Sequence, residues 1–343
     1  MKKFLSVFGL ALLVFNLNGC KPDDDGGSVP LRDYQTQYNV EKVNIENFLK
    51  THTYSSTTGQ GDFNSATFTT VPLGDPQALI NDPNLKSRVV RANDVDYTLY
   101  YLKLNEGAGD HPSNVDQVLA AYQGSYIYDN IEVETDDLTP VEFETDNFPQ
   151  QLLGLESAIR GWGEILPQFG IAGSVSNNPG EPQTFDDFGA GLMFIPSGLA
   201  YYNVYTGTIP SYSTLIFKFK LYSLYRLDHD ADGILSWQED VDFEPGVTNA
   251  DDPKAPRYMY FSESLITDDS DGDGIPNFRD VDDDNDNVLT KSEIRIPGTE
   301  VNGVWQYYPY TANEADGVQG IPSCSGDFFS ETRVRRHLDN TCN

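Results

Sequence analysis

A set of regularly spaced acidic residues between positions 228 and 293 constrains most strongly what this chain can fold into. Twelve carboxylates recur there at matching positions of three loops, and like charges held so close repel one another. Such loops cannot join an apolar core, because an ionised carboxylate loses too much hydration there. Without a cation to offset the repulsion, we expect this region to be expanded and mobile.

The acidic excess extends to the whole chain and limits its partners. There are 53 Asp and Glu residues against 22 Lys and Arg, which gives a formal net charge of -31. This balance argues against nucleic acid, since phosphate neutralisation needs a basic surface. It also argues against electrostatic docking on an anionic bilayer. The 20 Tyr and 19 Phe residues are too many for a disordered chain, so we expect at least one packed core.

The three loops have the spacing of an EF-hand calcium loop. In that loop, oxygen ligands at positions 1, 3, 5, 9 and 12 converge on one ion, position 7 offers its backbone carbonyl, and Gly at position 6 allows a sharp turn. Residues 228–239 follow the pattern with Gly233, and residues 269–280 also resemble a thrombospondin type 3 repeat. Residues 282–293 have Asn287 in place of the glycine, and Asn tolerates a positive φ. The predicted metal ligands are Asp228, Asp230, Asp232, Ile234, Ser236, Glu239, Asp269, Asp271, Asp273, Asn277, Asp280, Asp282, Asp284, Asp286, Thr290 and Glu293.

We expect up to three structural calcium ions in these loops, and no cofactor for catalysis. The sequence does not predict the long flanking helices of a calcium sensor, and only 3 Met residues are present to form a sensor's apolar groove. The alternative is an acidic linker whose spacing arises by chance, which three successive matches disfavour.

The first twenty residues predict an exported lipoprotein. Two lysines precede an apolar stretch, residues 4–15, which is long enough for a signal peptide but short for a bilayer span. The Leu17–Cys20 segment resembles a bacterial lipobox, which implies that residues 1–19 are removed and that Cys20 carries lipid. The membrane is then a partner through this lipid only. The acidic run at 23–25 resembles a surface-export signal, although a solvated tether would have the same composition. We expect an outer-membrane lipoprotein of the cell envelope, facing either the periplasm or the exterior.

Two cysteines remain, Cys324 and Cys342, which are an even pair in an oxidising compartment. We expect a disulfide that clamps the C-terminal tail, residues 296–343, and closing such a loop contributes about 3 kcal/mol. Composition places an anchor, flexible tether and N-terminal region at residues 20–95, and calcium-binding repeats at residues 226–295.

Residues 96–225 have the patterns of an antiparallel sheet. A run rich in Tyr and Leu at 97–104 and a second run at 116–128 are typical of strands. Residues 214–221 alternate cleanly, with Leu and Phe on one side and Lys218 and Lys220 on the other. This period of two predicts a half-buried strand.

One short helix is expected to pack against that sheet. A helical segment within residues 152–169 is broken by glycines and by Pro167, so its effective length is short. Another helical candidate, residues 40–49, precedes the sheet. The expected fold class is α+β, an antiparallel sheet wrapped on a short helix, followed by the region of calcium-binding loops.

Motifs in this domain resemble those of the FKBP-type peptidyl-prolyl cis-trans isomerases. They are Ile159-Arg160-Gly161-Trp162, the Met-Phe-Ile-Pro-Ser-Gly-Leu-Ala-Tyr segment at 193–201, and Ile209-Pro210 followed by Ser213-Thr214-Leu215-Ile216-Phe217. The resemblance covers residues 96–225 and implies a proline-binding pocket. In that pocket Trp162 would form the floor, Ile159 would offer a backbone N–H, and Tyr201 would offer its hydroxyl. The implied apolar walls are Tyr122, Ile209 and Phe217.

The first half of the domain matches the family less well. Tyr122-Gln123-Gly124 is retained, but Val133 and Glu134 stand where the family has a Phe-Asp pair that lines the pocket. Pro140-Val141-Glu142-Phe143 then resembles the family's Pro-x-x-Phe strand.

The resemblance implies an enzyme that isomerises X-Pro bonds in exported, proline-containing polypeptides by desolvating the imide and stabilising the twisted amide. The altered pair leaves open two alternatives. One is a non-catalytic module that binds proline-containing segments. The other is a calcium-stiffened lipoprotein that serves as an interaction surface.

Overall fold

The computed structural model describes residues 30–55, 63, 65–127, 138–241, 253–262, 265–266, 268–330 and 332–342. The chain forms two units, residues 1–32 and residues 33–343, and the second contains all the elements described below. The predicted signal peptide, the predicted lipidation site at Cys20, Val133 and Glu134 lie outside the described residues. No helix in the described part of the chain is long and apolar enough to span a membrane.

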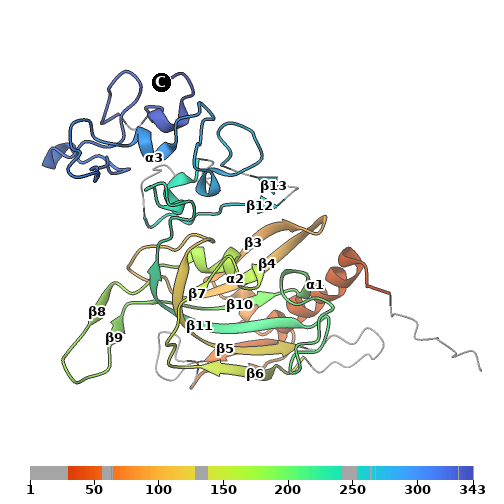
Figure 1. Ribbon diagram of the computed structural model, residues 1–343. Coiled ribbons are helices and arrows are strands. Elements are labelled where there is room, and N and C mark those ends of the chain that lie inside the picture. The colour runs from red at the N-terminus through yellow and green to blue at the C-terminus, as the bar shows by residue number, and fades with distance from the viewer. Residues whose placement is uncertain are drawn as a thin grey trace, which may run out of the picture. The chain divides into compact units, whose positions relative to one another are not determined.

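A seven-stranded antiparallel sheet precedes the acidic loops. Its strand order is β3-β4-β10-β11-β5-β6, and the short strand β7 also pairs with β5 (Figure 1). The central pair places Met193 opposite Phe217, and the next pair places Gly124 opposite Phe217. The strands are β3 (Leu85–Ala92), β4 (Val95–Asn105), β5 (Gln117–Ile127), β6 (Val141–Asp146), β7 (Leu153–Gly154), β10 (Gly189–Ile195) and β11 (Thr214–Tyr225).

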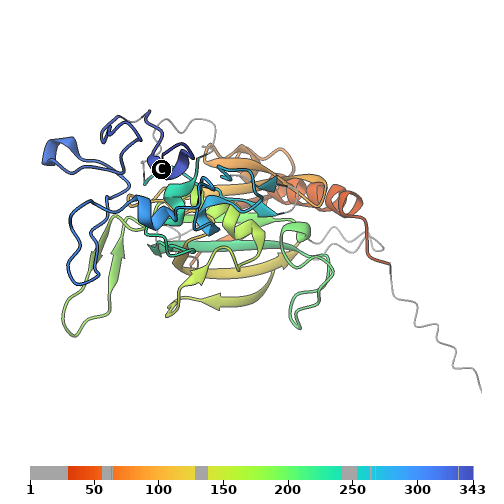
Figure 2. The same ribbon diagram turned by 45° about the horizontal axis from the view of Figure 1, so that its top comes forward.

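The central strand β10 is buried on both faces, because a helix covers each of them (Figures 1 and 2). Helix α1 (Tyr34–Thr51) packs Phe48 against Phe194, with ring centroids 5.8 Å apart. Helix α2 (Arg160–Ile165) packs into the apolar cluster that contains Met193 and Phe217, whose side chains belong to the other face. This double cover confirms an α+β fold with an antiparallel sheet and few helices.

The sheet begins before residue 96, where the sequence predicts the domain to start. Strand β3 pairs with β4 over its full length, and α1 extends the predicted 40–49 helix in both directions. The Asp33 carboxylate begins this helix by accepting a hydrogen bond from the Thr36 N–H at 2.8 Å. The segment assigned to the N-terminal region therefore supplies an edge strand and the cover of one face.

The elements that cover the α1 face of the sheet also change the environment of β11. Residues 214–219 are all buried, so the prediction of a half-buried strand is wrong for this part of β11. Lys218 donates to the carbonyl of Ala66 at 3.0 Å, and its ammonium lies 5.2 Å from the ring of Phe68. Both partners come from the hairpin region of β1 (His52–Ser55) and β2 (Thr67–Thr70). Burial lowers the pKa of Lys218.

Short elements make up the remainder of the described chain. After α2, a Gly- and Asn-rich segment forms a hairpin of β8 (Ser174–Ser176) and β9 (Thr184–Asp186). In the C-terminal part, Cys324 and Cys342 form a disulfide. The other elements, with η for a 3-10 helix, are η1 (Leu79–Asn81), η2 (Leu166–Gln168), η3 (Ser197–Leu199), η4 (Ser236–Glu239), β12 (Phe261–Ser262), β13 (Leu265–Ile266), η5 (Asn277–Arg279), α3 (Thr290–Glu293), η6 (Glu314–Asp316) and η7 (Arg336–Leu338).

Candidate functional site

An open cavity lies beside helix α2 and has an aromatic wall. Trp162 of α2 meets the ring of Tyr122 edge-on at 5.3 Å between centroids, and that of Phe217 at 5.2 Å. Phe143 meets Phe217 in the same way at 5.8 Å. Edge-to-face contacts of this kind are favourable and hold the rings at fixed angles. Strands β5, β6 and β11 and helix α2 therefore each contribute one ring to a single apolar surface.

Two glycines allow these elements to approach closely enough. A Cβ at Gly161 would lie 2.5 Å from the Ile195 side chain, so only glycine lets α2 sit this near to β10. A Cβ at Gly124 would lie 2.4 Å from the ring of Phe143, which therefore packs over bare backbone. Both glycines belong to the motifs noted in the sequence, and both act by admitting a neighbour.

The structure brings most of the sequence-predicted pocket residues together. Tyr122, Ile159, Trp162, Tyr201 and Phe217 all line the cavity. Ile209 is buried in the same apolar cluster as Trp162 and Phe217, but it is not one of the lining residues. Ile159 lies at the N-cap of α2, and its carbonyl accepts from the Trp162 N–H at 3.0 Å.

Strand β6 supplies pocket residues that the sequence analysis did not assign. Phe143, Glu144 and Asp146 line the cavity on this side. The signal that could have identified Phe143 is the Pro-x-x-Phe motif itself, because its last residue is the aromatic one. The two carboxylates had no comparable signal, since acidic residues are common throughout this chain.

The electrostatics of the cavity are acidic. No Lys, Arg or His occurs among its described lining residues, whereas Glu144 and Asp146 do. Burial and then the Glu144 charge raise the pKa of the Tyr122 hydroxyl, and the same two causes raise the pKa of Tyr201. Both phenols therefore stay protonated at neutral pH and can donate a hydrogen bond.

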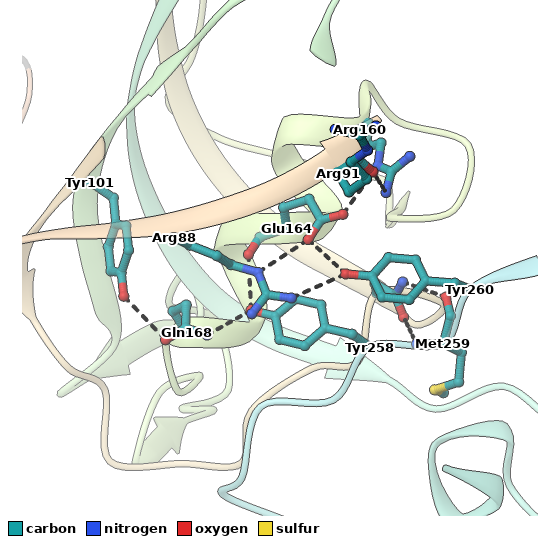
Figure 3. A network of polar contacts seen from close by, with 10 residues as sticks. Arg88, Arg91, Tyr101, Arg160, Glu164, Gln168, Tyr258, Met259 and Tyr260 are labelled. Atoms are coloured by element: carbon teal, nitrogen blue, oxygen red, sulfur yellow. Dashed lines mark hydrogen bonds and ion pairs between the residues drawn. The ribbon is translucent and has the colours of Figure 1, made fainter. Parts of the chain in front are cut away.

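Helix α2 is bonded to its neighbours through the buried carboxylate of its own residue Glu164 (Figure 3). Glu164 is 1% exposed, and its side chain accepts from the Arg88 Nε at 3.2 Å, the Arg160 Nε at 3.1 Å and the Tyr260 hydroxyl at 3.0 Å. The backbone carbonyl of Glu164 accepts from the Tyr258 hydroxyl at 2.9 Å. The helix that carries Trp162 is thus bonded to β3 and to a segment that follows the first acidic loop.

That segment is itself tightly bound. Asn114 and Met259 exchange two hydrogen bonds of 2.7 Å, one in each direction, between the amide side chain and the backbone. The Arg88 guanidinium stacks 3.5 Å from the centroid of the Tyr258 ring, and Gln168 donates to the Tyr258 hydroxyl at 2.7 Å (Figure 3). Residues 258–260 are therefore part of the support of α2.

A second connection joins the pocket side to the acidic loops. Glu156 lies in the segment just before α2, contacts His229 Nε2 at 3.3 Å and forms an ion pair with Arg279. His229 belongs to residues 228–239, which we call loop one, and Arg279 to residues 269–280, which we call loop two. Both loops thus contact the chain within a few residues of Ile159.

The three acidic loops share one hydrogen-bond pattern, with loop three being residues 282–293. In each, the position-1 carboxylate accepts from the N–H at position 6, and those at positions 3 and 5 accept from the N–H two residues on. The bonds are 2.6–3.2 Å long. Position 6 has positive φ throughout: 108° at Gly233, 96° at Gly274 and 71° at Asn287. Asn287 therefore makes the turn that the sequence assigned to it.

Three of the four predicted ligand carboxylates of each loop, those at positions 1, 3 and 5, gather at its centre. One oxygen from each of positions 1, 3 and 5 lies within 4.8 Å of the others in Asp228, Asp230 and Asp232, and the same holds for loops two and three. Burial, followed by repulsion from neighbouring carboxylates, raises the pKa of Asp230 to about 8 and of Glu293 to about 8. The arrangement is unfavourable to negative charge unless a cation accompanies it.

Position 9 differs from its expected role in all three loops. Its side chain accepts a hydrogen bond from the backbone N–H at position 2, at 3.2 Å for Ser236, 2.9 Å for Asn277 and 3.2 Å for Thr290. The Ser236 hydroxyl also lies 2.8 Å from Nδ1 of His229. These side chains close the loop on itself, and the sequence pattern does not distinguish that role from metal ligation.

Comparison with known proteins gives partial matches. Residues 229–320 match a family model described as BamM C-terminal, which is well under half of the chain. No curated protein matches. The chain is similar to a solved peptidyl-prolyl cis-trans isomerase from Pseudomonas syringae pv. tomato, with 19% identity, a TM-score of 0.30 and coverage of 42% of this chain and 84% of that chain.

Two further solved structures are similar over 42% of this chain. FkpA from Escherichia coli is 23% identical with a TM-score of 0.29, and the chain spans 52% of its length. The N-terminal domain of FKBP42 from Arabidopsis thaliana is 14% identical with a TM-score of 0.28, and 97% of it is covered. At these scores the likenesses decide nothing about function, which has to be argued from the residues.

Proposed function

We propose that the cavity binds proline-containing polypeptides and that the protein is a peptidyl-prolyl cis-trans isomerase of the FKBP type. The observation that supports this best is that the ring centroids of Trp162, Tyr122 and Phe217 lie within 6.0 Å of one another in an open cavity. Their rings offer a proline side chain an apolar surface. Tyr201, which is 39% exposed, places a hydroxyl donor on the same cavity.

Such a cavity suits the reaction, which needs no nucleophile, base or metal. Rotation about a peptide bond has a barrier of about 18–20 kcal/mol because amide resonance is lost, and an X-Pro bond exchanges in roughly tens to hundreds of seconds. The twisted amide has a less polar carbonyl than the planar one. An apolar wall that excludes water therefore favours the twisted state over the planar state, and this difference lowers the barrier.

A protease-coupled isomerisation assay on the chain from Lys21 to Asn343 tests the proposal. Trp162→Ala should reduce turnover at least tenfold, whereas Trp305→Ala, a tryptophan outside the cavity, should leave it unchanged. Circular dichroism would verify that both variants are folded. Absence of turnover in the folded, unmodified chain would exclude the enzyme.

A second candidate function is binding without turnover. The observation that favours it is the acidic side of the cavity, where Glu144 and Asp146 make the wall more polar than a desolvating pocket requires. Retention of a proline peptide by the unmodified chain, lost in Trp162→Ala and unaccompanied by isomerisation, would support this function.

We further infer that the three acidic loops bind calcium as a structural ion. The repeated convergence of three carboxylates, held by the same backbone hydrogen bonds each time, supports this. Hard oxygen ligands of this kind suit Ca²⁺, which takes six to eight of them. Calcium should raise the thermal midpoint of unfolding and a chelator should lower it. A midpoint insensitive to both would contradict the inference.

We also propose an outer-membrane-associated place in the cell envelope. The lipobox-like Leu17–Cys20 segment and the BamM C-terminal match over residues 229–320 support it. The substrates would then be exported polypeptides. The unmodified chain should incorporate labelled fatty acid. Cys20→Ala should lose this label and should be released from the membrane fraction.

A further inference from the structure

One acidic residue outside the predicted ligand set reaches the first loop from the third. Asp283 occupies position 2 of loop three, where an EF-hand loop has no ligand. One of its carboxylate oxygens nevertheless lies within 4.8 Å of an oxygen of Asp232 and of an oxygen of Glu239, both in loop one. The cluster therefore contains carboxylates from two loops that are distant in the sequence.

All three side chains of this cluster are buried. Asp232 is 2% exposed, Glu239 is 3% and Asp283 is 1%. Neither carboxylate oxygen of Glu239 has a hydrogen-bond partner, although this side chain is more than nine-tenths buried and is aimed at the other two. A buried carboxylate without a partner is costly, and three that face one another are more so.

The nearby basic side chain does not fill this space. Lys291 of loop three acts electrostatically on Asp232, but its ammonium donates to the backbone carbonyl of Ala231 at 2.6 Å. That bond is a second connection between loops one and three. The centre of the cluster is left to something small, positively charged and able to accept several oxygens.

A calcium ion has these properties. Its oxygen ligands lie at about 2.3–2.6 Å, so two ligands on opposite sides of one ion are separated by about 5 Å. The oxygens of Asp232, Glu239 and Asp283 lie within 4.8 Å of one another, which this span accommodates. In loop one the Ser236 hydroxyl accepts from the His229 N–H, which uses one of its two lone pairs.

We propose that Asp283 is a ligand to the calcium ion of loop one, so that a single ion binds loops one and three together. The proposal rests on the calcium-binding function proposed above for the loops. Asp232 and Glu239 supply the loop-one side of the shell, and Asp283 adds a charged ligand from loop three. The ion then acts as a cross-link between the segment after β11 and the third loop.

Terbium luminescence can isolate this site in the chain from Lys21 to Asn343. Tb³⁺ replaces Ca²⁺ and emits when a nearby tryptophan is excited. Trp237 lies within loop one, whereas loops two and three contain no tryptophan. Because Trp237 also lies in one apolar cluster with Phe278 of loop two, only the emission that is lost both in Trp237→Phe and in Glu239→Gln belongs to loop one. Its dependence on Tb³⁺ and competing Ca²⁺ gives the affinity of that site.

The expected result is that Asp283→Asn weakens this site on the order of tenfold or more, since affinity follows the number of charged ligands. The matched control is Asp271→Asn, the same substitution in loop two. It should leave the affinity of the loop-one site for the ion within about twofold of that of the unmodified chain. Equal affinities for Asp283→Asn and the unmodified chain would overturn the shared site while leaving calcium binding by loop one intact.

A measurement of thermal unfolding guards against a trivial folding defect. Removing a buried, unpartnered charge should raise the thermal midpoint of the calcium-free chain, whereas losing a ligand should reduce the rise that calcium produces. Asp283→Asn should therefore raise the calcium-free midpoint and narrow the gap between the calcium-free and calcium-loaded midpoints. A variant that is less stable both with and without calcium would show that Asp283 has a packing role only. If the unmodified chain gives no Trp237-dependent emission at all, calcium binding by loop one fails with it.

Discussion

Replacing Glu164 by Gln should lower the free energy of unfolding by about 2–3 kcal/mol, although the two side chains have nearly the same shape. A hydrogen bond to a charged group contributes about 1.5–3 kcal/mol, and a neutral one about 0.5–1.5 kcal/mol. The Arg88 bond is well buried, with 16% and 2% of the two side chains exposed, so its loss counts nearly in full. The Arg160 side chain is 36% exposed, so solvent screens that pair and its share is about 0.5 kcal/mol. The Tyr260 bond adds a further contribution of about 0.5–1 kcal/mol.

Urea denaturation followed by tryptophan fluorescence measures this change, with Arg160→Gln as the matched control. That variant removes the exposed partner and should cost less than about 1 kcal/mol. If Glu164→Gln unfolds at the same urea concentration as the unmodified chain, the carboxylate is not what fastens α2. A loss in Arg160→Gln as large as that in Glu164→Gln would equally refute the reasoning, because burial would then not separate the two arginines.

Two other predictions concern charge. Burial, and then Arg335, lowers the pKa of His337 to about 3, so the fold excludes the imidazolium form. The contribution of the neutral imidazole to the free energy of unfolding is complete above about pH 6.5 and is lost as the pH falls towards 3. Between pH 7 and pH 5 the loss is about 2 kcal/mol. His337→Leu should not show this loss when the two chains are compared by urea denaturation. In the cavity, Glu144 and Asp146 should favour a basic residue beside the proline, so that a Lys-Pro peptide binds about fivefold more tightly than a Glu-Pro peptide at low salt. A preference that survives in the Glu144→Gln, Asp146→Asn double variant would show that these carboxylates do not cause it.

The strand pattern of the sheet could be predicted from sequence, but the cover on its second face could not. Period two at residues 214–221 indicates a strand, yet it says nothing about what lies over the lysines. Lys218 is buried because the paired strands β1 and β2 and helix α1 come from far away in the sequence. The sequence alone does not distinguish a lysine that is buried against aromatic rings and a carbonyl from a lysine that is exposed to water.

The candidate site divides in the same way. The motifs around Trp162 and Phe217 are local, and the structure places those residues on one cavity. Phe143 lines it too, because strand β6 pairs with β5 and carries its ring over Gly124. In the loops, spacing identifies the converging carboxylates, but it does not show that position 9 turns towards the N–H at position 2. Nor does it show that Asp283 approaches a different loop, which depends on how the loops pack.

Strand β6 has a further consequence for the protein as a solute. Within the described residues it ends the strand order of the sheet, so its outer N–H and C=O groups are available to another chain. Three of its six residues are acidic: Glu142, Glu144 and Asp146. A second copy approaching this edge would meet the same charges, and the repulsion discourages edge-to-edge aggregation. Neutralising these carboxylates to make the cavity more apolar would therefore reduce the solubility of the protein. The polarity of the cavity wall and the solubility of the chain thus depend on the same residues.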